Sequence, residues 1–498
     1  MNTVILTASA LIINTMNMVF NVYISNRMGA ETIGLIQLMM SVYALAVTLA
    51  CSGINLAVTR LVAEELAVGN EGGMKKAVRI CVIHALIFSS LACVSLLCSA
   101  QFIATYWLKT TMAVRPLRVL SLTLPFISLS TVFSGYFTAV KRIGKSALAN
   151  IFIQFIRIGT VTALMNFVFA KDMESSCIAI VTGGLISEML ALLINFIHHM
   201  KDKKQYESEK CGSCILKRTL NISLPIALSS YIRSSLGMFK NVITPLRMEK
   251  SGIGVSRALA GYGVVRGMVM PMLLFPSSFL YAFSSLLVPE LATRHIKGES
   301  ENIRYATAKI FKYTLIFSIL VCGIIFGFAE DLGKALYKNE DVSLYIKLLT
   351  PLIPVMYFDS IVDGLLKGLN EQVAVVRINI ADTVLTILLS WFLLPLFGMN
   401  GYIIIIYISE FFNAFLSMKR LLKATNVELK IIDWIIKPLI SVTASVVVAK
   451  FLNVQFNVQF IAGICMGISL YILLLFALRV IGKDDIGDLF SKKTRLLY

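Results

Sequence analysis

The sequence predicts an all-α membrane protein with about fourteen membrane-spanning helices, arranged as two alike six-helix lobes followed by two extra C-terminal helices. Composition is the first reason. Hydrophobic residues make up 57% of the 498 residues, charged residues make up 15%, and the mean hydropathy is +0.80. Roughly 20 apolar residues cross a bilayer, and such stretches follow one another along almost the whole chain. An internal repeat is the second reason.

The second half of the chain repeats short motifs of the first half in the same order. Met18, Asn21 and Val22 recur as Met238, Asn241 and Val242, Leu61–Glu64 recurs as Leu287–Glu290, and Pro125, Gly135 and Asn150 recur as Pro354, Gly364 and Asn379. Each match alone is weak, but three matches in one order indicate a duplicated half. Repeated halves packed around a shared site are typical of secondary transporters.

The apolar stretches place the predicted helices along the chain. They lie near residues 3–25, 32–59, 80–106, 116–140, 146–169, 177–199, 219–245, 259–289, 311–329, 344–366, 378–397, 401–418, 434–454 and 458–480. The first stretch lacks a basic leading segment and a small-x-small cleavage site, which predicts a retained helix rather than a secretory signal. The polar segment Lys201–Lys217 falls where the repeated halves meet, and we interpret it as a linker. The predicted domains are therefore 1–205, 206–425 and 426–498.

The net charge of +18 is distributed as in a membrane protein. Loops after even-numbered predicted helices, counted with the adjoining helix ends and the C-terminal tail, carry 30 Lys and Arg residues, whereas loops after odd-numbered helices, counted in the same way, carry 12. Positively charged loops stay in the cytoplasm, so we expect a multi-pass protein of the cytoplasmic membrane with both termini inside. The basic excess then reflects topology and contact with lipid rather than nucleic acid. We expect a monomer.

Several classes of function are disfavoured. The loops are too short for a catalytic domain, the four histidines lack the spacing of metal ligands, and there is no Gly-rich phosphate-binding loop. We therefore expect no enzyme, no cofactor and no metal centre. Cys211 and Cys214, together with His198 and His199, are conceivable zinc ligands. Reduced thiols in a polar loop are the more ordinary interpretation.

Cationic residues at bilayer depth are the main candidates for substrate binding, because such residues are costly and often functional. Arg233, Lys240 and Arg247 are spaced seven apart in one predicted helix, so they stack on one face. Arg27 occupies the position equivalent to Arg247 in the first repeat. The alternative for Arg27 and Arg247 is that they lie near helix ends and reach the interface without binding anything.

Arg266 adds a further cation in the next predicted helix. It lies in a glycine-rich stretch before Pro271 and Pro276, and these prolines are expected to break the helix and free backbone groups to line a cavity. Together the cations predict a basic cleft. Guanidinium and ammonium groups suit the oxygens of phosphate. The alternative for Arg233 and Lys240 is neutralisation by acids elsewhere in the chain.

Acidic and amide side chains gather in the second half of the repeat. Asp359 and Asp363 share one helix face, and Asn379 and Asp382 lie on the next helix. Further polar residues follow them: Thr383, Thr386, Ser390, Glu410 and Asn413. Such oxygen-rich groups suit a coupling Na⁺ or a titrating proton. The alternatives are an ion pair of Asp363 with Lys367, and a hydrogen-bond network that holds the helices together.

The sequence also resembles the stage V sporulation protein B family. The likeness covers nearly the whole chain and is carried by Asp363–Gln372 (DGLLKGLNEQ), Arg377–Asp382 (RINIAD), Leu394–Tyr402, Gly29–Gly34 and Arg60–Glu65. That family belongs to the multidrug/oligosaccharidyl-lipid/polysaccharide (MOP) exporter superfamily, with lipid II flippases and multidrug extruders. The resemblance implies a V-shaped, MATE-like fold in which predicted helices 1, 2, 7 and 8 line a central cleft. It also implies movement of a lipid-linked sugar between membrane leaflets.

The predicted function is that of a cation-coupled flippase for a polyprenyl-diphosphate-linked saccharide, a precursor of cell wall or polysaccharide, working by alternating access. The charged headgroup would enter the cleft while the lipid tail stays in the bilayer, where the last two helices offer a groove. The alternative is a cation-coupled multidrug extruder of the same fold, whose cationic substrates would prefer an acidic cleft. A membrane glycosyltransferase or polymerase is disfavoured by the short loops, and a scaffold that transports nothing would not need charge at mid-bilayer.

Overall fold

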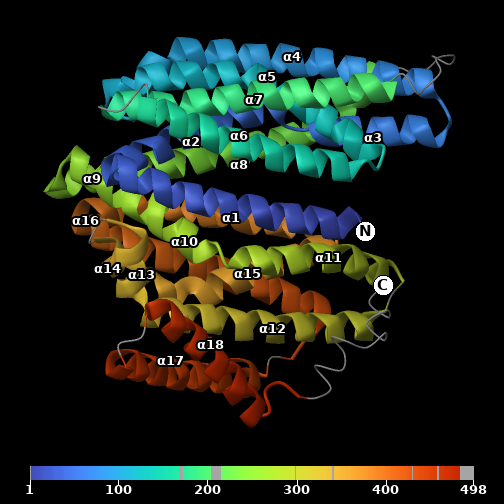
Figure 1. Cartoon of the computed structure of the whole chain (residues 1–498). Coiled ribbons are helices and arrows are strands. Elements are labelled where there is room, and N and C mark those ends of the chain that lie inside the picture. Colours follow the sequence, from blue (N-terminus) through green and yellow to red (C-terminus); the bar gives the residue numbers. More distant parts are fainter. Residues whose placement is uncertain are drawn as a thin grey trace. The chain divides into compact units, whose positions relative to one another are not determined.

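The computed structural model describes residues 2–167, 172–203, 215–297, 299–338, 341–428, 430–456 and 459–482. Helices joined by short turns make up this part of the chain, which contains no β-strand (Figure 1). Within the described residues the predicted helical ranges fall mainly on helical segments, and residues 168, 169 and 458 of those ranges lie outside the described residues. Ten helices of the described part are long and apolar enough to cross a membrane. The protein is therefore a multi-pass membrane protein, and the count of fourteen spans stays a prediction.

The chain forms two compact units. The first unit comprises Met1–Phe20 and Ala30–Gly263. It contains most of α1 (Asn2–Met28), followed by α2 (Ala30–Cys51), α3 (Ile54–Ala67), α4 (Glu71–Phe102), α5 (Val114–Ala139), α6 (Ile143–Phe167), α7 (Met173–Lys203), α8 (Ile215–Met248) and α9 (Val255–Gly263). In this unit α4, α5 and α7 lie side by side (Figure 1). Its core packs α3, α4 and α5 around side chains such as Leu61 and Tyr136.

The second unit comprises Asn21–Gly29 and Val264–Tyr498. It contains the π-helical turn η4 (Val264–Val269), then α10 (Met270–Leu274), α11 (Ser277–Ile296), α12 (Ser300–Gly327), α13 (Ala329–Leu336), α14 (Asp341–Leu349), α15 (Ile353–Gly368), α16 (Gln372–Thr425), α17 (Lys437–Phe456) and α18 (Phe460–Ala477). Its main core lies among α11, α12, α15 and α16 around Phe311 and Leu366, and α17 packs on both α12 and α18. These two units do not coincide with the domains predicted from the repeat, whose boundaries lie near residues 205 and 425. The predicted boundaries concern the duplicated halves of the sequence and remain a prediction.

Two prolines interrupt the eighth predicted helix, as expected. The stretch predicted at 259–289 is divided into α9, η4, α10 and α11. Pro271 is the second residue of the short α10, and Pro276 immediately precedes α11. Because proline has no N–H and its ring clashes with the preceding turn, the helix cannot run straight through this region. Arg266 lies within the π-helical turn that results.

The long α16 is a hairpin of two helices rather than one rod. Gly398 adopts φ 51° and ψ −123°, outside the helical region, which glycine accepts because it has no Cβ. The Ser409 hydroxyl donates to the Asp382 carboxylate at 2.6 Å. In a straight helix the same residues would be roughly 40 Å apart. The chain therefore reverses near Gly398, and the two helices predicted at 378–397 and 401–418 run back along each other.

An ion-pair network joins the end of α3 to the start of α8 in the first unit. The Arg218 guanidinium donates to Glu65 Oε1 at 2.8 Å and also to Glu64, both on α3. These hydrogen bonds raise the pKa of the Arg218 guanidinium. Glu65 is buried and also accepts from Asn70 Nδ2 at 2.7 Å. The end of α3 and the beginning of α8 are therefore fixed to one another, and α8 belongs to the first unit.

Two glycines allow α2 and α9 to cross closely within the first unit. A Cβ added at Gly34 would lie 2.1 Å from the Leu259 carbonyl oxygen, and one added at Gly263 would lie 2.0 Å from the Ala30 carbonyl oxygen. Small residues at helix crossings let backbones approach in membranes. No larger side chain fits at either position without a shift of backbone.

Substitution at this crossing is expected to destabilise the first unit. Gly34→Val should lower the melting temperature of the purified protein, because overpacking costs about 1–3 kcal/mol. Gly237→Ala on α8 is the matched control, since a Cβ there meets nothing within 4 Å and alanine favours a helix. Thermal unfolding in detergent measures both. Equal melting temperatures for Gly34→Val and Gly237→Ala would contradict the close crossing.

The predicted topology is testable with native thiols. Cys211 and Cys214 lie outside the described residues, in the loop predicted to be cytoplasmic. In a background where Cys51, Cys98, Cys322 and Cys465, which are not buried, are replaced by serine, an impermeant maleimide should label the protein only after cells are permeabilised. Thr111→Cys, in a predicted outer loop, should be labelled in intact cells and controls for reagent activity. Labelling of Cys211 and Cys214 in intact cells would overturn the predicted orientation.

Candidate substrate and ion sites

A hollow beside α8 surrounds the first of the predicted cations. It has a volume of about 350 Å³ and is lined by Val47, Thr48, Cys51, Ser52, Ser230, Arg233 and Ser234. These residues come from α2, the turn after it and α8, all within the first unit. The Arg233 side chain is exposed and forms no ion pair with any described residue. The proposed neutralisation of Arg233 by an acid is therefore not observed.

Hydroxyl groups surround this guanidinium. Thr48 Oγ1 donates to Ser234 Oγ at 3.0 Å, which ties α2 to α8 at the hollow. Ser52 and Ser230 contribute two further hydroxyls. A guanidinium presents a fork of N–H donors that matches oxyanions, and hydroxyls both donate and accept. The hollow therefore has the chemistry to hold a phosphate group or a sugar.

Sequence analysis missed the hydroxyls of this hollow. A signal for two of them was present, because Ser230 and Ser234 flank Arg233 within one and three residues on the same helix. Thr48 and Ser52 lie far away in the sequence and carried no such signal. Lys240 and Arg247 follow Arg233 along α8 at the predicted spacing, and both are half-buried. Each of the two has an interaction partner in the structure.

The other two predicted cations belong to the second unit. Arg266 lies in η4, and Arg27 lies at the end of α1. Both side chains are exposed and neither forms an ion pair with a described residue. The five predicted cations are therefore distributed over both units. Arg233, Lys240 and Arg247 lie in the first unit, and Arg27 and Arg266 lie in the second. Their assembly into one basic cleft remains a prediction.

The predicted acids converge in the second unit, on α15 and both arms of α16. Asn413 Nδ2 donates to Asp359 Oδ2 at 2.9 Å and to Asn379 Oδ1 at 3.4 Å. Asn379 Nδ2 donates to Asp363 Oδ2 at 3.4 Å. Lys367 forms no ion pair with Asp363. Three helical segments thus bring two carboxylates and two amides together.

Asp382 forms a neighbouring contact with hydroxyls. Its carboxylate, 9% exposed, accepts from Ser409 Oγ at 2.6 Å. Thr386 Oγ1 donates to the Asp382 carbonyl at 2.9 Å and lies 3.2 Å from Ser409 Oγ. These bonds hold the two arms of α16 together. The predicted hydrogen-bond network is therefore present, and it includes Ser409, which sequence analysis did not single out.

Several oxygens in this cluster are buried without a hydrogen bond of 3.5 Å or less to a described residue, although the Ser417 hydroxyl lies near both Asp359 and Asp363. They are Asp359 Oδ1, Asp363 Oδ1, Asn413 Oδ1 and Ser417 Oγ. Each unsatisfied buried group costs about 1–3 kcal/mol, so the network alone does not satisfy the cluster. Oxygen donors of this kind are the ligands that hard cations prefer. The residues fit a small cation or a bound proton.

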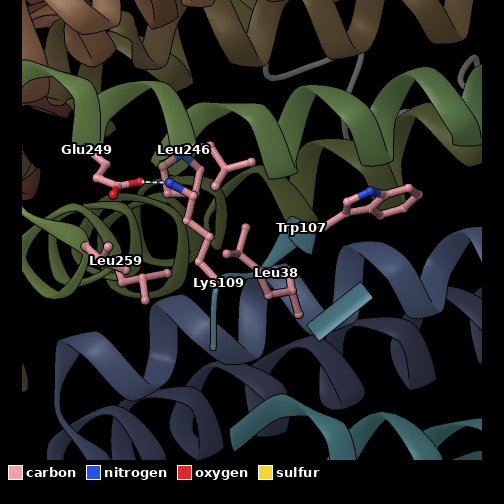
Figure 2. A pocket seen from close by; sticks show the side chains of 9 residues that line it. Leu38, Trp107, Lys109, Leu246, Glu249 and Leu259 are labelled. Carbon is pink, nitrogen blue, oxygen red and sulfur yellow. Dashed lines mark hydrogen bonds and ion pairs between the residues drawn. The ribbon is translucent and has the colours of Figure 1, made fainter. Parts of the chain in front are cut away.

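An ion pair marks the other end of α8 in the first unit. Figure 2 shows Lys109 reaching from the turn after α4 toward Glu249, and their Nζ and Oε2 atoms are 2.5 Å apart. The pocket around them has room for only about 10 Å³ and is lined by apolar side chains such as Leu38 and Leu246. That is the size of one water molecule, too small for a substrate. The described residues contain no group of three or more His, Cys, Asp and Glu side chains placed to hold a metal.

Comparisons with known proteins agree with the predicted resemblance. The family described as polysaccharide biosynthesis protein matches residues 1–289, and the MatE family matches residues 225–392. Stage V sporulation protein B of Bacillus subtilis (strain 168) is 23% identical over 506 residues, 97% of this chain and 96% of that protein. The predicted likeness to that family is thereby confirmed.

Solved structures show the same fold. A multidrug resistance MATE family transporter of the MOP superfamily, in an inward-facing conformation, aligns with a TM-score of 0.63 at 15% identity, over 86% of this chain and 100% of that one. The lipid II flippase MurJ, in an inward closed conformation, aligns with a TM-score of 0.60 at 14% identity, over 97% and 99%. The predicted MATE-like helical fold is therefore confirmed.

Proposed function

Because this chain belongs to the polysaccharide biosynthesis protein family, we propose that it moves a polyprenyl-diphosphate-linked saccharide across the cytoplasmic membrane by alternating access. The observation that carries the proposal is the hollow at Arg233. A guanidinium that forms no ion pair with a described residue lies there among four hydroxyls. The guanidinium suits the diphosphate and the hydroxyls suit the sugar.

Binding of the headgroup alone suffices for such a substrate. The polyprenyl tail is as apolar as the lipids and gains nothing from leaving them. The charged headgroup is the part that cannot cross hydrocarbon unaided. Exposed apolar side chains such as Val447, Phe451 and Leu473 on α17 and α18 provide a surface against which a tail can lie.

We also propose that a cation drives the movement. The site would be the oxygen cluster around Asp359 and Asp363, with Asn379 and Asp382 beside it. Buried oxygens without partners support this, because a bound Na⁺ or proton would satisfy them. A ligand shifts a conformational equilibrium only through different affinity for the two states. Opening and closing of the oxygen cluster would give the cation a different affinity for the two conformational states.

Multidrug extrusion is the second candidate, supported by the MATE-like fold. The hollow itself argues against it. Cationic drugs are repelled by an unpaired guanidinium, whereas a diphosphate is attracted. The two candidates therefore differ in the charge of the substrate.

Transport in proteoliposomes tests the proposal. The purified full-length protein should accelerate flipping of a fluorescent polyprenyl-diphosphate disaccharide, measured as accessibility to dithionite. Polyprenyl monophosphate without the sugar should flip more slowly, and ethidium uptake should be unchanged. Ethidium transport without flipping of the diphosphate lipid would replace the proposal by drug extrusion. No acceleration of either substrate would reject both.

A further inference from the structure

The lining of the hollow at Arg233 includes the end of a broken helix. The helix predicted at 32–59 is divided into α2 and α3. Gly53 lies between the two with φ 78° and ψ −18°, a left-handed conformation that glycine adopts without strain because it has no Cβ. A Cβ at this position would also lie 2.5 Å from the Ser223 carbonyl oxygen of α8. Both the backbone conformation and the packing therefore require glycine at the break.

The broken end of α2 supplies side chains to the hollow, among them Thr48, Cys51 and Ser52. The last carbonyls of a helix have no hydrogen-bond partner within it, so a helix end needs other partners to keep one conformation. The Thr48 carbonyl accepts from the Ser52 backbone N–H at 3.0 Å, which closes the last turn. The next two carbonyls, those of Leu49 and Ala50, accept from side chains of two other helices.

A serine of α5 binds the Ala50 carbonyl. Ser128 is fully buried, and its hydroxyl donates to the Ala50 carbonyl at 3.1 Å. The Ala85 carbonyl of α4 lies 3.4 Å from the same hydroxyl, and the Cys51 thiol lies near it. Ser128 does not itself line the hollow. It therefore acts on the lining only through the end of α2.

A tyrosine of α8 binds the Leu49 carbonyl. The Tyr231 hydroxyl donates to this carbonyl at 3.4 Å, which is longer than most hydrogen bonds and therefore weaker. Close to it along α8, Ser234 accepts from the Thr48 hydroxyl at 3.0 Å. The end of α2 is therefore held both by α5 and by α8, and all of these contacts lie within the first unit.

We propose that Ser128 and Tyr231 are positioning residues for the saccharide of the substrate. By holding the end of α2, they keep the Thr48 and Ser52 hydroxyls where a sugar in the hollow meets them. The inference rests on the proposed function and assigns the sugar to the α2 side of the hollow. Arg233, assigned to the diphosphate, is carried by α8 instead. Groups that are ordered before the ligand arrives bind it more tightly, because less freedom is lost on binding.

Deletion of one hydroxyl separates the two parts of the substrate. The full-length protein in detergent is titrated by calorimetry with farnesyl diphosphate and with farnesyl diphosphate that carries an N-acetylglucosamine disaccharide. Ser128→Ala should weaken binding of the disaccharide ligand about threefold to tenfold and leave binding of farnesyl diphosphate unchanged. An equal loss for both ligands, or no loss for either, would overturn the positioning role.

Ser121→Ala is the matched control for this measurement. Ser121 is equally buried on the same helix, but its hydroxyl donates to the Arg118 carbonyl of that helix at 2.6 Å. Its removal should leave both affinities unchanged. Tyr231→Phe is the second test variant, and it should weaken binding of the disaccharide ligand by less than Ser128→Ala does, because its hydrogen bond is longer. Weaker binding of farnesyl diphosphate alone in this variant would contradict the assignment of the sugar.

A double-variant cycle tests whether Ser128 acts through the lining of the hollow. If it acts through Ser52, Ser128→Ala should have little further effect on the disaccharide ligand in a Ser52→Ala background. The same loss in both backgrounds would overturn this connection. Hydrogen exchange gives a readout without any ligand: backbone amides in 48–54 should exchange faster in Ser128→Ala and at the parent rate in Ser121→Ala. Unchanged exchange in Ser128→Ala would also overturn the inference.

The two ligands distinguish failure of this inference from failure of the proposed function. A parent protein that binds farnesyl diphosphate equally well with and without the disaccharide would overturn sugar recognition in the hollow and leave diphosphate binding in place. A parent protein that binds neither ligand better than farnesol would overturn the proposed function, and the inference with it.

Discussion

The Arg233→Ala, Lys240→Ala double variant is expected to lose flipping of a polyprenyl-diphosphate saccharide almost completely. Arg233 is the cation of the hollow, and Lys240 follows it on the same helix face. A hydrogen bond to a charged group contributes about 1.5–3 kcal/mol, so each substitution should weaken binding at least roughly tenfold. The double variant should weaken it roughly a hundredfold if the effects add.

The measurement is the initial flipping rate in proteoliposomes at equal protein content. Arg257→Ala on α9 is the matched control, because it removes an exposed positive charge from the same unit without touching the hollow. It should keep the parent rate. Normal flipping by the double variant would contradict binding of the diphosphate in this hollow, whatever the flipping rate of the Arg257→Ala control.

The second large effect is expected at the oxygen cluster. The parent protein should melt at a higher temperature, and flip faster, when Na⁺ or an inward-favouring pH gradient is supplied. A ligand at a hundred times its dissociation constant stabilises the folded state by about 2.7 kcal/mol. Asp359→Asn and Asp382→Asn should abolish this dependence, because an amide cannot supply the charge that a cation needs.

The same variants distinguish ion binding from a structural role. If Asp359 and Asp382 only hold helices together, replacing them with asparagine should lower the melting temperature, while the response of the protein to ions persists. Thr307→Val on α12 is the matched control, since its buried hydroxyl also lacks a hydrogen-bond partner and does not belong to the cluster. It should keep the full ion response. A parent protein that responds to neither Na⁺ nor pH would end the coupling proposal.

The helices were predictable because membrane spanning imposes a strong and local signal. A run of apolar residues identifies each span wherever it lies, and the two prolines near Arg266 predicted the break that the structure shows. The reversal at Gly398 was also accessible, because a helix predicted on either side needs a turn between. The number of spans does not follow from apolar runs alone, since α16 contains two predicted helices and α9 to α11 divide one.

The candidate sites were predictable only where charge stood out against an apolar background. Arg233, Asp359 and Asp382 were visible for that reason. Thr48, Ser52 and Ser417 were not, because hydroxyls are common in membrane helices and acquire meaning only from neighbours far away in the sequence. The close crossing of Gly34 and Gly263 escaped notice for the same reason. Contacts of this kind depend on packing, which no local pattern encodes.

The tight reversal of α16 has a consequence for which ions the cluster can accept. Asp382 lies on one arm of the hairpin and Asn413 on the other, and Ser409 and Thr386 bind the arms to each other. The arms cannot slide or separate without breaking these bonds, so the spacing of their oxygens is set by the backbone. While these bonds hold, the oxygens of the two arms keep one spacing, and any opening of the cluster has to come from α15. A site of fixed spacing discriminates by ionic radius. Na⁺ should therefore be accepted and K⁺ rejected by size, with no need for a dedicated filter.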